Sequence, residues 1–194
     1  MAIMQSDIPL PLLTFEQYMA EGEFNKRYAI IDGERIFMPS PTWRHQRISR
    51  NVTQALSDYE AAFRTGLMVS APLDVLIQRQ PLRTRQPDAL FISHGRLAQI
   101  GGTPPDGPLP IGPELVVEIL SPSDTTGVLA DKIADYQRAG VEECWLLHSD
   151  SQTVEILLLM HSDSVSPTLY KAGQNAQSVV FPDLVVAVEA LFAV

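Results

Sequence analysis

The sequence predicts an α/β (α+β) fold with a mixed central sheet flanked by helices, an N-terminal β-hairpin and antiparallel strands near the C-terminus. Two short, mostly apolar runs, Glu114–Leu120 and Cys144–His148, are typical of buried strands. A helical pattern lies between them, and a strand–helix–strand crossover makes its two strands parallel. Asp32-Gly33 separates two further strand-like segments, which is a strong hairpin signal.

Length and composition favour one domain, residues 1–194, in a cytoplasmic protein. The apolar runs are too short to span a membrane, and no basic segment followed by a long apolar stretch indicates export. The single cysteine, Cys144, is expected to be an inert buried thiol. A formal charge of −9 argues against general binding to polyanions but leaves room for a local basic contact surface.

The first third of the chain predicts a short helix, a hairpin and a long helix. Thr14-Phe-Glu-Gln17 fits a capping box, so a helix is expected to run through Met19. The hairpin is expected at Arg27–Met38. A helix at Thr42–Arg64, ended by Gly66, is expected because apolar residues recur there at helical spacing: Ile48, Val52, Leu56, Tyr59 and Phe63.

The middle of the chain predicts strands separated by two loops. The strands are expected at Leu67–Val69, Pro72–Ile77 and Pro87–Ile92. Gln78–Gln86 is polar and rich in arginine, and residues 93–113 are rich in glycine and proline, so both segments predict loops.

Glu118 lies in the apolar centre of the strand Glu114–Leu120. A buried carboxylate must be paired, protonated or bound to a metal, because burying it alone is costly. Asp88 enters the preceding strand on the same face as Leu90 and Ile92, toward the core.

The segment Ser-Pro-Ser-Asp-Thr-Thr-Gly at 121–127 supplies capping residues for a helix at Val128–Ala139, which Gly140 ends. Lys132 falls inside the apolar arc of this helix, which consists of Val128, Leu129, Ile133, Tyr136 and Ala139. Asp131 and Arg138 lie on the opposite face, and Asp135 lies at the edge of the arc. Lys132 therefore faces the layer of Glu118, either as part of a functional site, as a structural ion pair, or as a lysine that extends to the edge of the sheet.

The C-terminal part predicts further strands and a last turn of helix. Thr153–Leu159 and Thr168–Lys171 form a hairpin, and Gln177–Phe181, Leu184–Val188 and a helical turn at Glu189–Phe192 follow. Apolar residues of the last strands would suit a dimer surface or the core: Val179, Val180, Leu184, Val185 and Val186.

Two groups of arginines are candidate phosphate contacts, although such groups are more often solvated faces. They are Arg44, Arg47 and Arg50, and Arg79, Arg83 and Arg85. His45, on the apolar face of the long helix, is either a core histidine or a residue that reaches a site from the start of the helix.

The order of elements and residues resembles the PD-(D/E)XK nuclease superfamily, whose restriction-endonuclease-like fold has an αβββαβ core. More closely, the chain resembles a bacterial family of predicted restriction endonucleases that was formerly a domain of unknown function. The resemblance covers nearly the whole chain and rests on Tyr28…Ile31-Asp-Gly-Glu34, Pro41…His45, Pro87-Asp88, Leu115-Val-Val-Glu-Ile-Leu-Ser-Pro122 and Lys132…Tyr136…Ala139-Gly-Val141…Trp145.

This resemblance implies a metal-dependent endonuclease that hydrolyses phosphodiester bonds in DNA. Asp88 and Glu118 would hold Mg²⁺ or Mn²⁺, which would polarise the phosphate and acidify a bound water. Lys132 would position the attacking water and offset phosphate charge. His45, Glu34 and Tyr136 are accessory candidates, Arg44, Arg47, Arg83 and Arg85 are candidate nucleic-acid contacts, and a homodimer is expected because many nucleases of this fold act as dimers.

Two positions depart from the pattern. The superfamily's usual lysine lies two residues after the acid, where this chain has Leu120, and Lys132 on the following helix takes its place. Ala29 stands where relatives commonly have glutamate. The alternative function is therefore a catalytically degenerate nuclease-fold protein that binds nucleic acid or a protein partner. A metal hydrolase of small phosphate esters is a third possibility and would need a closed pocket.

Overall fold

The structure, a computed structural model, describes residues 12–21, 28–103, 106–121, 124–160 and 167–193. Its centre is a six-stranded sheet with the order β10-β9-β8-β7-β6-β3. These strands are β3 (Gly66–Ser70), β6 (Ala89–Ser93), β7 (Leu115–Leu120), β8 (Glu143–His148), β9 (Thr153–Leu158) and β10 (Pro167–Tyr170). β7 and β8 run parallel and the other neighbouring pairs run antiparallel, which confirms the predicted mixed sheet.

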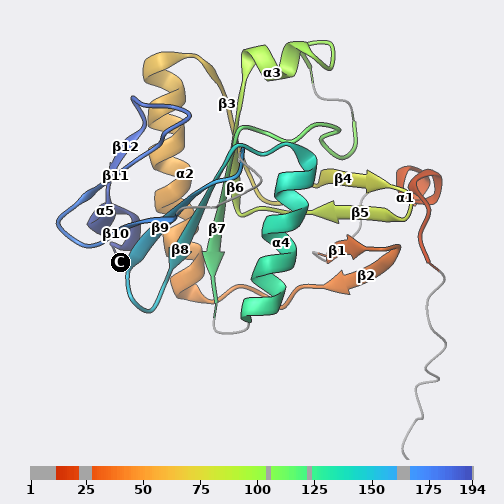
Figure 1. The fold of residues 1–194 in the computed structure, drawn as a ribbon, viewed down its shortest axis with the longest axis horizontal. Helices are drawn as coiled ribbons and strands as arrows, with labels where there is room; N and C mark the ends of the chain where they lie inside the picture. Colours follow the sequence, from red (N-terminus) through yellow and green to blue (C-terminus); the bar gives the residue numbers. More distant parts are fainter. Residues whose placement is uncertain (1–11, 22–27, 104–105, 122–123, 161–166, 194) are drawn as a thin grey trace, which may run out of the picture.

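Helices α2 (Trp43–Phe63) and α4 (Thr126–Ala139) cover opposite faces of this sheet (Figure 1). Alternate residues of each strand point to opposite faces, so β7 contributes to two cores. Val117 packs in the cluster that contains Ile48 of α2, whereas Val116 packs in the cluster that contains Tyr136 of α4. Glu118 follows Val116 by two residues and therefore points toward α4. The predicted crossover of β7, α4 and β8 is confirmed.

Two hairpins lie beside α4 (Figure 1). They are β1 (Tyr28–Ile31) with β2 (Glu34–Phe37), and β4 (Val75–Arg79) with β5 (Leu82–Arg85). The first was predicted, and Asp32 and Gly33 have the positive φ values, 52° and 87°, that its turn requires. Helix α1 (Phe15–Glu21) begins at the predicted capping box, because Thr14 Oγ accepts from the N–H of Gln17 at 3.2 Å.

The remaining elements are short helices and strands outside the central sheet. They are α3 (His94–Ala98), β11 (Asn175–Gln177), β12 (Val185–Ala187) and α5 (Val188–Phe192). Figure 1 shows β11, β12 and α5 next to α2. The final helix agrees with the prediction, and β12 lies within the predicted strand Leu184–Val188. The predicted strand Gln177–Phe181 shares only Gln177 with β11, which pairs with β12.

Helix caps follow the local sequence, with one exception. Thr42 caps α2, Thr125 caps α4, and Gly140 ends α4 with φ 83°. The prediction that Gly66 ends α2 was wrong, because Arg64 takes the left-handed conformation with φ 54°. Gly66 belongs to β3, where a Cβ atom would lie 2.2 Å from the carbonyl oxygen of Ile92. Close approach of two strands, and not helix termination, requires glycine there.

Both predicted loops of the middle segment contain regular structure. Gln78–Gln86 forms the end of β4 and all of β5, in which Arg83 and Arg85 are buried. Charged residues made this segment resemble a loop, but aspartates of α4 neutralise them. Residues 93–113 include α3, whose first turn Ser93 caps by accepting from the N–H of Arg96, and whose Leu97 is buried.

The predicted apolar arc of α4 needs two corrections. Val128 is 46% exposed and stands outside the core. Asp135, expected at the edge of the arc, is fully buried. Hydrogen bonds to arginines of the β4–β5 hairpin, which no helical wheel can show, make this burial possible.

Arg27, Pro122 and Ser123, which the predictions also covered, lie outside the described residues. Within the described ranges, no helix is long and apolar enough to cross a membrane. Cys144 is buried, and burial raises the pKa of its thiol well above the usual value, as expected for an inert cysteine.

Candidate active site

Asp88 and Glu118 come together because β6 and β7 are neighbours in the sheet. Asp88 immediately precedes β6, and its N–H donates to the carbonyl of Val117 at 3.0 Å. Its side chain in turn accepts from the N–H of Ile119, with 2.9 Å between the nitrogen and Oδ2. These two bonds place the Asp88 carboxylate beside the backbone on either side of Glu118.

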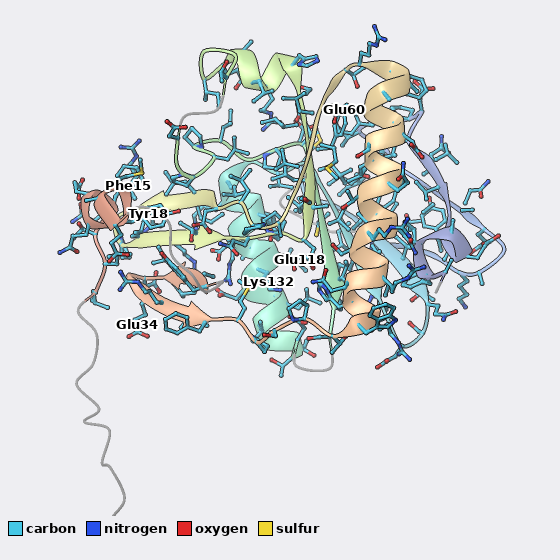
Figure 2. All side chains as sticks on the ribbon, turned by 180° about the vertical axis from the view of Figure 1, so that it is seen from behind. Phe15, Tyr18, Glu34, Glu60, Glu118 and Lys132 are labelled. Carbon is cyan, nitrogen blue, oxygen red and sulfur yellow. The ribbon has the colours of Figure 1, made fainter. Side chains whose placement is uncertain are left out.

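Helix α4 supplies two donors to the Glu118 carboxylate, which is 4% exposed. Lys132 Nζ lies 3.0 Å from Oε2, and the Tyr136 hydroxyl donates to Oε1. Lys132 and Tyr136 are four residues apart and therefore lie on one face of the helix. Figure 2 shows Lys132 directed toward Glu118, in the orientation that the helical pattern predicted.

The charges in this cluster affect one another. Burial raises the pKa of Glu118, the Lys132 ammonium opposes this effect, and the negative charge of Asp88 adds to it. Burial alone would lower the pKa of Lys132, but the charges of Glu118 and Asp124 outweigh burial and raise it. Lys132 is therefore an ammonium at neutral pH, while the two neighbouring carboxylates repel each other.

His45 and Asp124 extend the cluster on either side. His45 Nε2, at the start of α2, lies 3.4 Å from Asp88 Oδ2. Asp124 Oδ1 lies 3.2 Å from Lys132 Nζ, and its Oδ2 accepts from the hydroxyl of Ser121 at 2.7 Å. Asp124 was not among the predicted site residues, because the pattern of 121–127 indicated only helix capping. An acidic residue four positions after the end of the strand that carries Glu118 was the available signal.

Other candidate residues lie elsewhere. Glu34 is exposed on β2, and Figure 2 shows it apart from Glu118 and Lys132. Arg44 is exposed and Arg47 half-buried on α2.

Arg83 and Arg85 are buried, and their guanidinium groups bind aspartates of α4. Arg83 Nε lies 2.7 and 2.8 Å from the two oxygens of Asp135, and Arg85 Nε lies 2.6 Å from Oδ2. Arg83 Nη2 also lies 2.6 Å from Asp131. We call these four residues the arginine–aspartate clamp. Their burial and pairing remove Arg83 and Arg85 from the candidate nucleic-acid contacts.

The clamp fixes the rotation of α4 about its axis. Asp131 and Asp135 directly precede Lys132 and Tyr136, and adjacent helical residues point about 100° apart. When Asp131 and Asp135 are held by β5, Lys132 and Tyr136 are turned toward Glu118. Arg83 and Arg85 therefore influence the site indirectly, because they bind α4 and the hydrogen bonds described for them do not include Glu118.

Within the part of the chain that the structure describes, no group of three or more His, Cys, Asp or Glu side chains is arranged to hold a metal ion. Asp88 and Glu118, which we call the acidic pair, provide two carboxylate groups. Mg²⁺ is commonly held by one or two carboxylates together with waters and substrate phosphates, so two carboxylates suit this ion better than a complete protein cage would.

Comparison with known proteins agrees with the fold. The model of the Uma2 family, described as "Putative restriction endonuclease", matches residues 14–189. Comparison with curated proteins gave no match. The structure is similar to the crystal structure of "a putative nuclease belonging to DUF820" from Anabaena variabilis ATCC 29413, with a TM-score of 0.74 and 18% identity over 93% of this chain and 98% of that chain. At this identity, the likeness shows a shared fold.

Proposed function

The chain belongs to the Uma2 family of restriction-endonuclease-like proteins, and from this premise we propose that it is an endonuclease that hydrolyses phosphodiester bonds in DNA with Mg²⁺ or Mn²⁺. Family and fold support a nuclease in general terms. The more specific proposal rests on one observation. Two buried carboxylates, Asp88 and Glu118, lie on neighbouring strands beside the ammonium of Lys132, whose Nζ is 3.0 Å from Glu118.

The acidic pair has the chemistry that a hard divalent cation requires. Both ligands would be carboxylate oxygens, and the Asp88 charge that raises the pKa of Glu118 is a repulsion that a cation would relieve. When bound between Asp88 and Glu118, the metal would polarise the scissile phosphate and lower the pKa of a coordinated water.

The other residues of the site have separate roles in this proposal. Lys132 keeps its proton at neutral pH, so it offsets phosphate charge and holds the attacking water as a donor, and it does not act as a base. Tyr136 orients the Glu118 carboxylate through its hydroxyl. His45 orients Asp88 from the side of α2.

The alternative is a nuclease-fold protein without catalytic activity. Ala29 is the observation in its favour, because this buried residue of β1 offers no carboxylate where relatives commonly have one. The intact acidic pair and Lys132 favour the enzyme, and the two possibilities differ in whether DNA is cut.

The first test is thermal unfolding with and without Mn²⁺. A ligand present at about 100 times its dissociation constant stabilises the folded state by about 2.7 kcal/mol. We expect this gain in the wild type and its loss in the double variant Asp88→Asn, Glu118→Gln. Asp74→Asn, which changes a buried carboxylate on β4's N-terminal side, is the matched control and should keep the gain. An equal response of wild type and double variant would refute a metal site at the acidic pair.

Cleavage of DNA in the presence of Mg²⁺ is the second test. If Mn²⁺ stabilises the protein but no DNA is cut, the inactive alternative is favoured.

A cytoplasmic homodimer is a further part of the proposal. Of the apolar C-terminal residues, Val179 and Val185 are 58% and 48% exposed, and can contribute to a dimer surface. Leu184 is buried, and Val180 and Val186 pack against the core. Sedimentation of the purified protein measures the oligomeric state.

A further inference from the structure

Trp43, the first residue of α2, has an unusually exposed side chain. At 75%, it has the highest exposure among the large hydrophobic side chains that the structure describes. Trp145, the second tryptophan of the chain, is by contrast 2% exposed in the core. A large aromatic ring left in solvent at the end of a helix contributes little to folding, so it marks a candidate contact surface.

Arginines surround Trp43 on α2. Arg47 and Arg50 lie within about 60° of Trp43 on a helical wheel of about 100° per residue, on the solvent side of the helix. Arg44 lies on the flank, and the first turn contains no acidic residue. We call Trp43, Arg44, Arg47 and Arg50 the α2 tip. On a chain whose formal charge is −9, this concentration of positive charge favours an anionic partner.

Two of the three arginines of the α2 tip, Arg44 and Arg50, have exposed side chains that are available to such a partner. Arg47 is half-buried, and its Nε is shielded from solvent with no hydrogen-bond acceptor among the described residues. Arg44 pairs with Asp150 at 3.1 Å, but both side chains are exposed, and an exposed ion pair contributes little.

The α2 tip begins next to the acidic site. His45, two residues after Trp43, reaches Asp88. Asp150, the partner of Arg44, lies in the turn between β8 and β9, where the hydroxyl of Ser149 donates to the carbonyl of Leu120 at the end of β7. Figure 1 shows the N-terminal end of α2 and the C-terminal end of β7 at the same edge of the fold.

We infer that the α2 tip binds an unpaired nucleic-acid strand next to the acidic site, with Trp43 stacked on a base and the arginines on phosphates. The inference rests on the proposed function and adds the substrate class: nucleic acid with a single-stranded stretch beside the scissile bond. An aromatic side chain can stack on a base face only where the base is not already stacked in a duplex. Trp43 and His45 lie on opposite sides of a helix about 10 Å wide, which an unpaired strand of a few nucleotides can span.

The test measures binding by the inactive Asp88→Asn protein, so that cleavage does not interfere. The probes are a fluorescein-labelled oligothymidine and a blunt duplex of equal length, followed by fluorescence anisotropy. Trp43→Ala should weaken binding of the single strand by about 5- to 150-fold, which corresponds to the roughly 1–3 kcal/mol of one stacked base. Trp43→Phe should restore most of the affinity, because a phenyl ring also stacks. Binding of the duplex should be weaker and should change less than twofold.

Intrinsic fluorescence gives a second measurement in the same samples. The single strand should quench the exposed Trp43 and leave the buried Trp145 unaffected, so the quenching should vanish in Trp43→Phe. Because Trp43 is exposed, neither substitution should lower the melting temperature, and this control separates lost contact from lost folding.

Three results would overturn the inference. The first is that Trp43→Ala binds the single strand as well as the parent does, and the second is that duplex binding depends on Trp43 to the same extent as single-strand binding. The third is that Trp43→Ala dissociates a dimer seen in sedimentation without nucleic acid, which would make the α2 tip an interface between copies. In each case the Mn²⁺ response of the acidic pair still decides the proposed function separately.

Discussion

The arginine–aspartate clamp makes a quantitative prediction about Asp135. This side chain is 1% exposed and accepts from Arg83, Arg85 and Arg138. The Asp135→Asn substitution removes the negative charge. It also replaces one carboxylate oxygen, an acceptor, by an amide N–H₂ group, which is a donor and faces the guanidinium donors. Arg83 and Arg85, whose side chains are 9% and 8% exposed, then keep their own charges with less compensation.

Removing one partner of a buried ion pair typically costs about 3–5 kcal/mol. Asp131 continues to bind both arginines, so we expect a loss near the lower end, about 3 kcal/mol. For a chain of this length, each kcal/mol lowers the melting temperature by about 2–4 °C, which gives a decrease of roughly 6–12 °C. This loss is a large share of a typical folding free energy of about 5–15 kcal/mol.

Asp131→Asn is the matched control. It removes the same charge from the same helix and the same arginines, but the Asp131 side chain is 52% exposed. Exposed ion pairs contribute about 0–1 kcal/mol, so its melting temperature should fall by no more than about 4 °C. Urea unfolding at constant pH and salt concentration measures the free energy of unfolding of both variants. Equal losses for Asp131→Asn and Asp135→Asn would show that burial does not determine the strength of the clamp, and would refute the reasoning.

Two further predictions concern stability outside the candidate site. Burial raises the pKa of Asp74 in the folded protein, and the hydrogen bond from Tyr18 only partly opposes this rise. The stabilising contribution of Asp74 is therefore fully present below the pKa of about 4 that the residue has in the unfolded chain. It is lost as the pH rises through the higher pKa of the folded state. The free energy of unfolding of Asp74→Asn should therefore rise relative to wild type between pH 4 and pH 8 in urea titrations, and a difference that does not change with pH would contradict the prediction. In a second prediction, Gly66→Ala should lower the free energy of unfolding by about 1–3 kcal/mol, because the added Cβ would lie 2.2 Å from the carbonyl oxygen of Ile92. Gly127→Ala in α4, where a Cβ meets nothing within 4 Å, should instead stabilise by about 0.5–1 kcal/mol, and thermal unfolding that gave both variants the same sign would exclude this account.

Much of the fold was predictable because its signals are local. The Thr14 capping box, the Asp32-Gly33 turn and the Gly140 helix end each depend on residues within a few positions of one another. The parallel pairing of β7 and β8 followed from the length of the connection between them.

The centre of the candidate site was also visible in the sequence. Helical periodicity carries direction, so the position of Lys132 within the apolar arc of α4 predicted that it faces the strand of Glu118. The roles of Asp88, Glu118 and Lys132 in catalysis stay predictions, which the metal-binding and cleavage tests address.

What the sequence by itself determined is therefore most of the elements, with β5 and α3 as exceptions, and the direction of most side chains within them. The tertiary structure alone decided which charged residues could be buried. Arg83 and Asp135 are 52 positions apart, and each alone indicates a solvent-exposed segment. Packing of β5 against α4 brings them to 2.7 Å, and the resulting charge compensation turns a predicted loop into a buried strand. The contact between His45 and Asp88 arises in the same way, because the free energy of burying a charge depends on a partner that sequence periodicity does not encode.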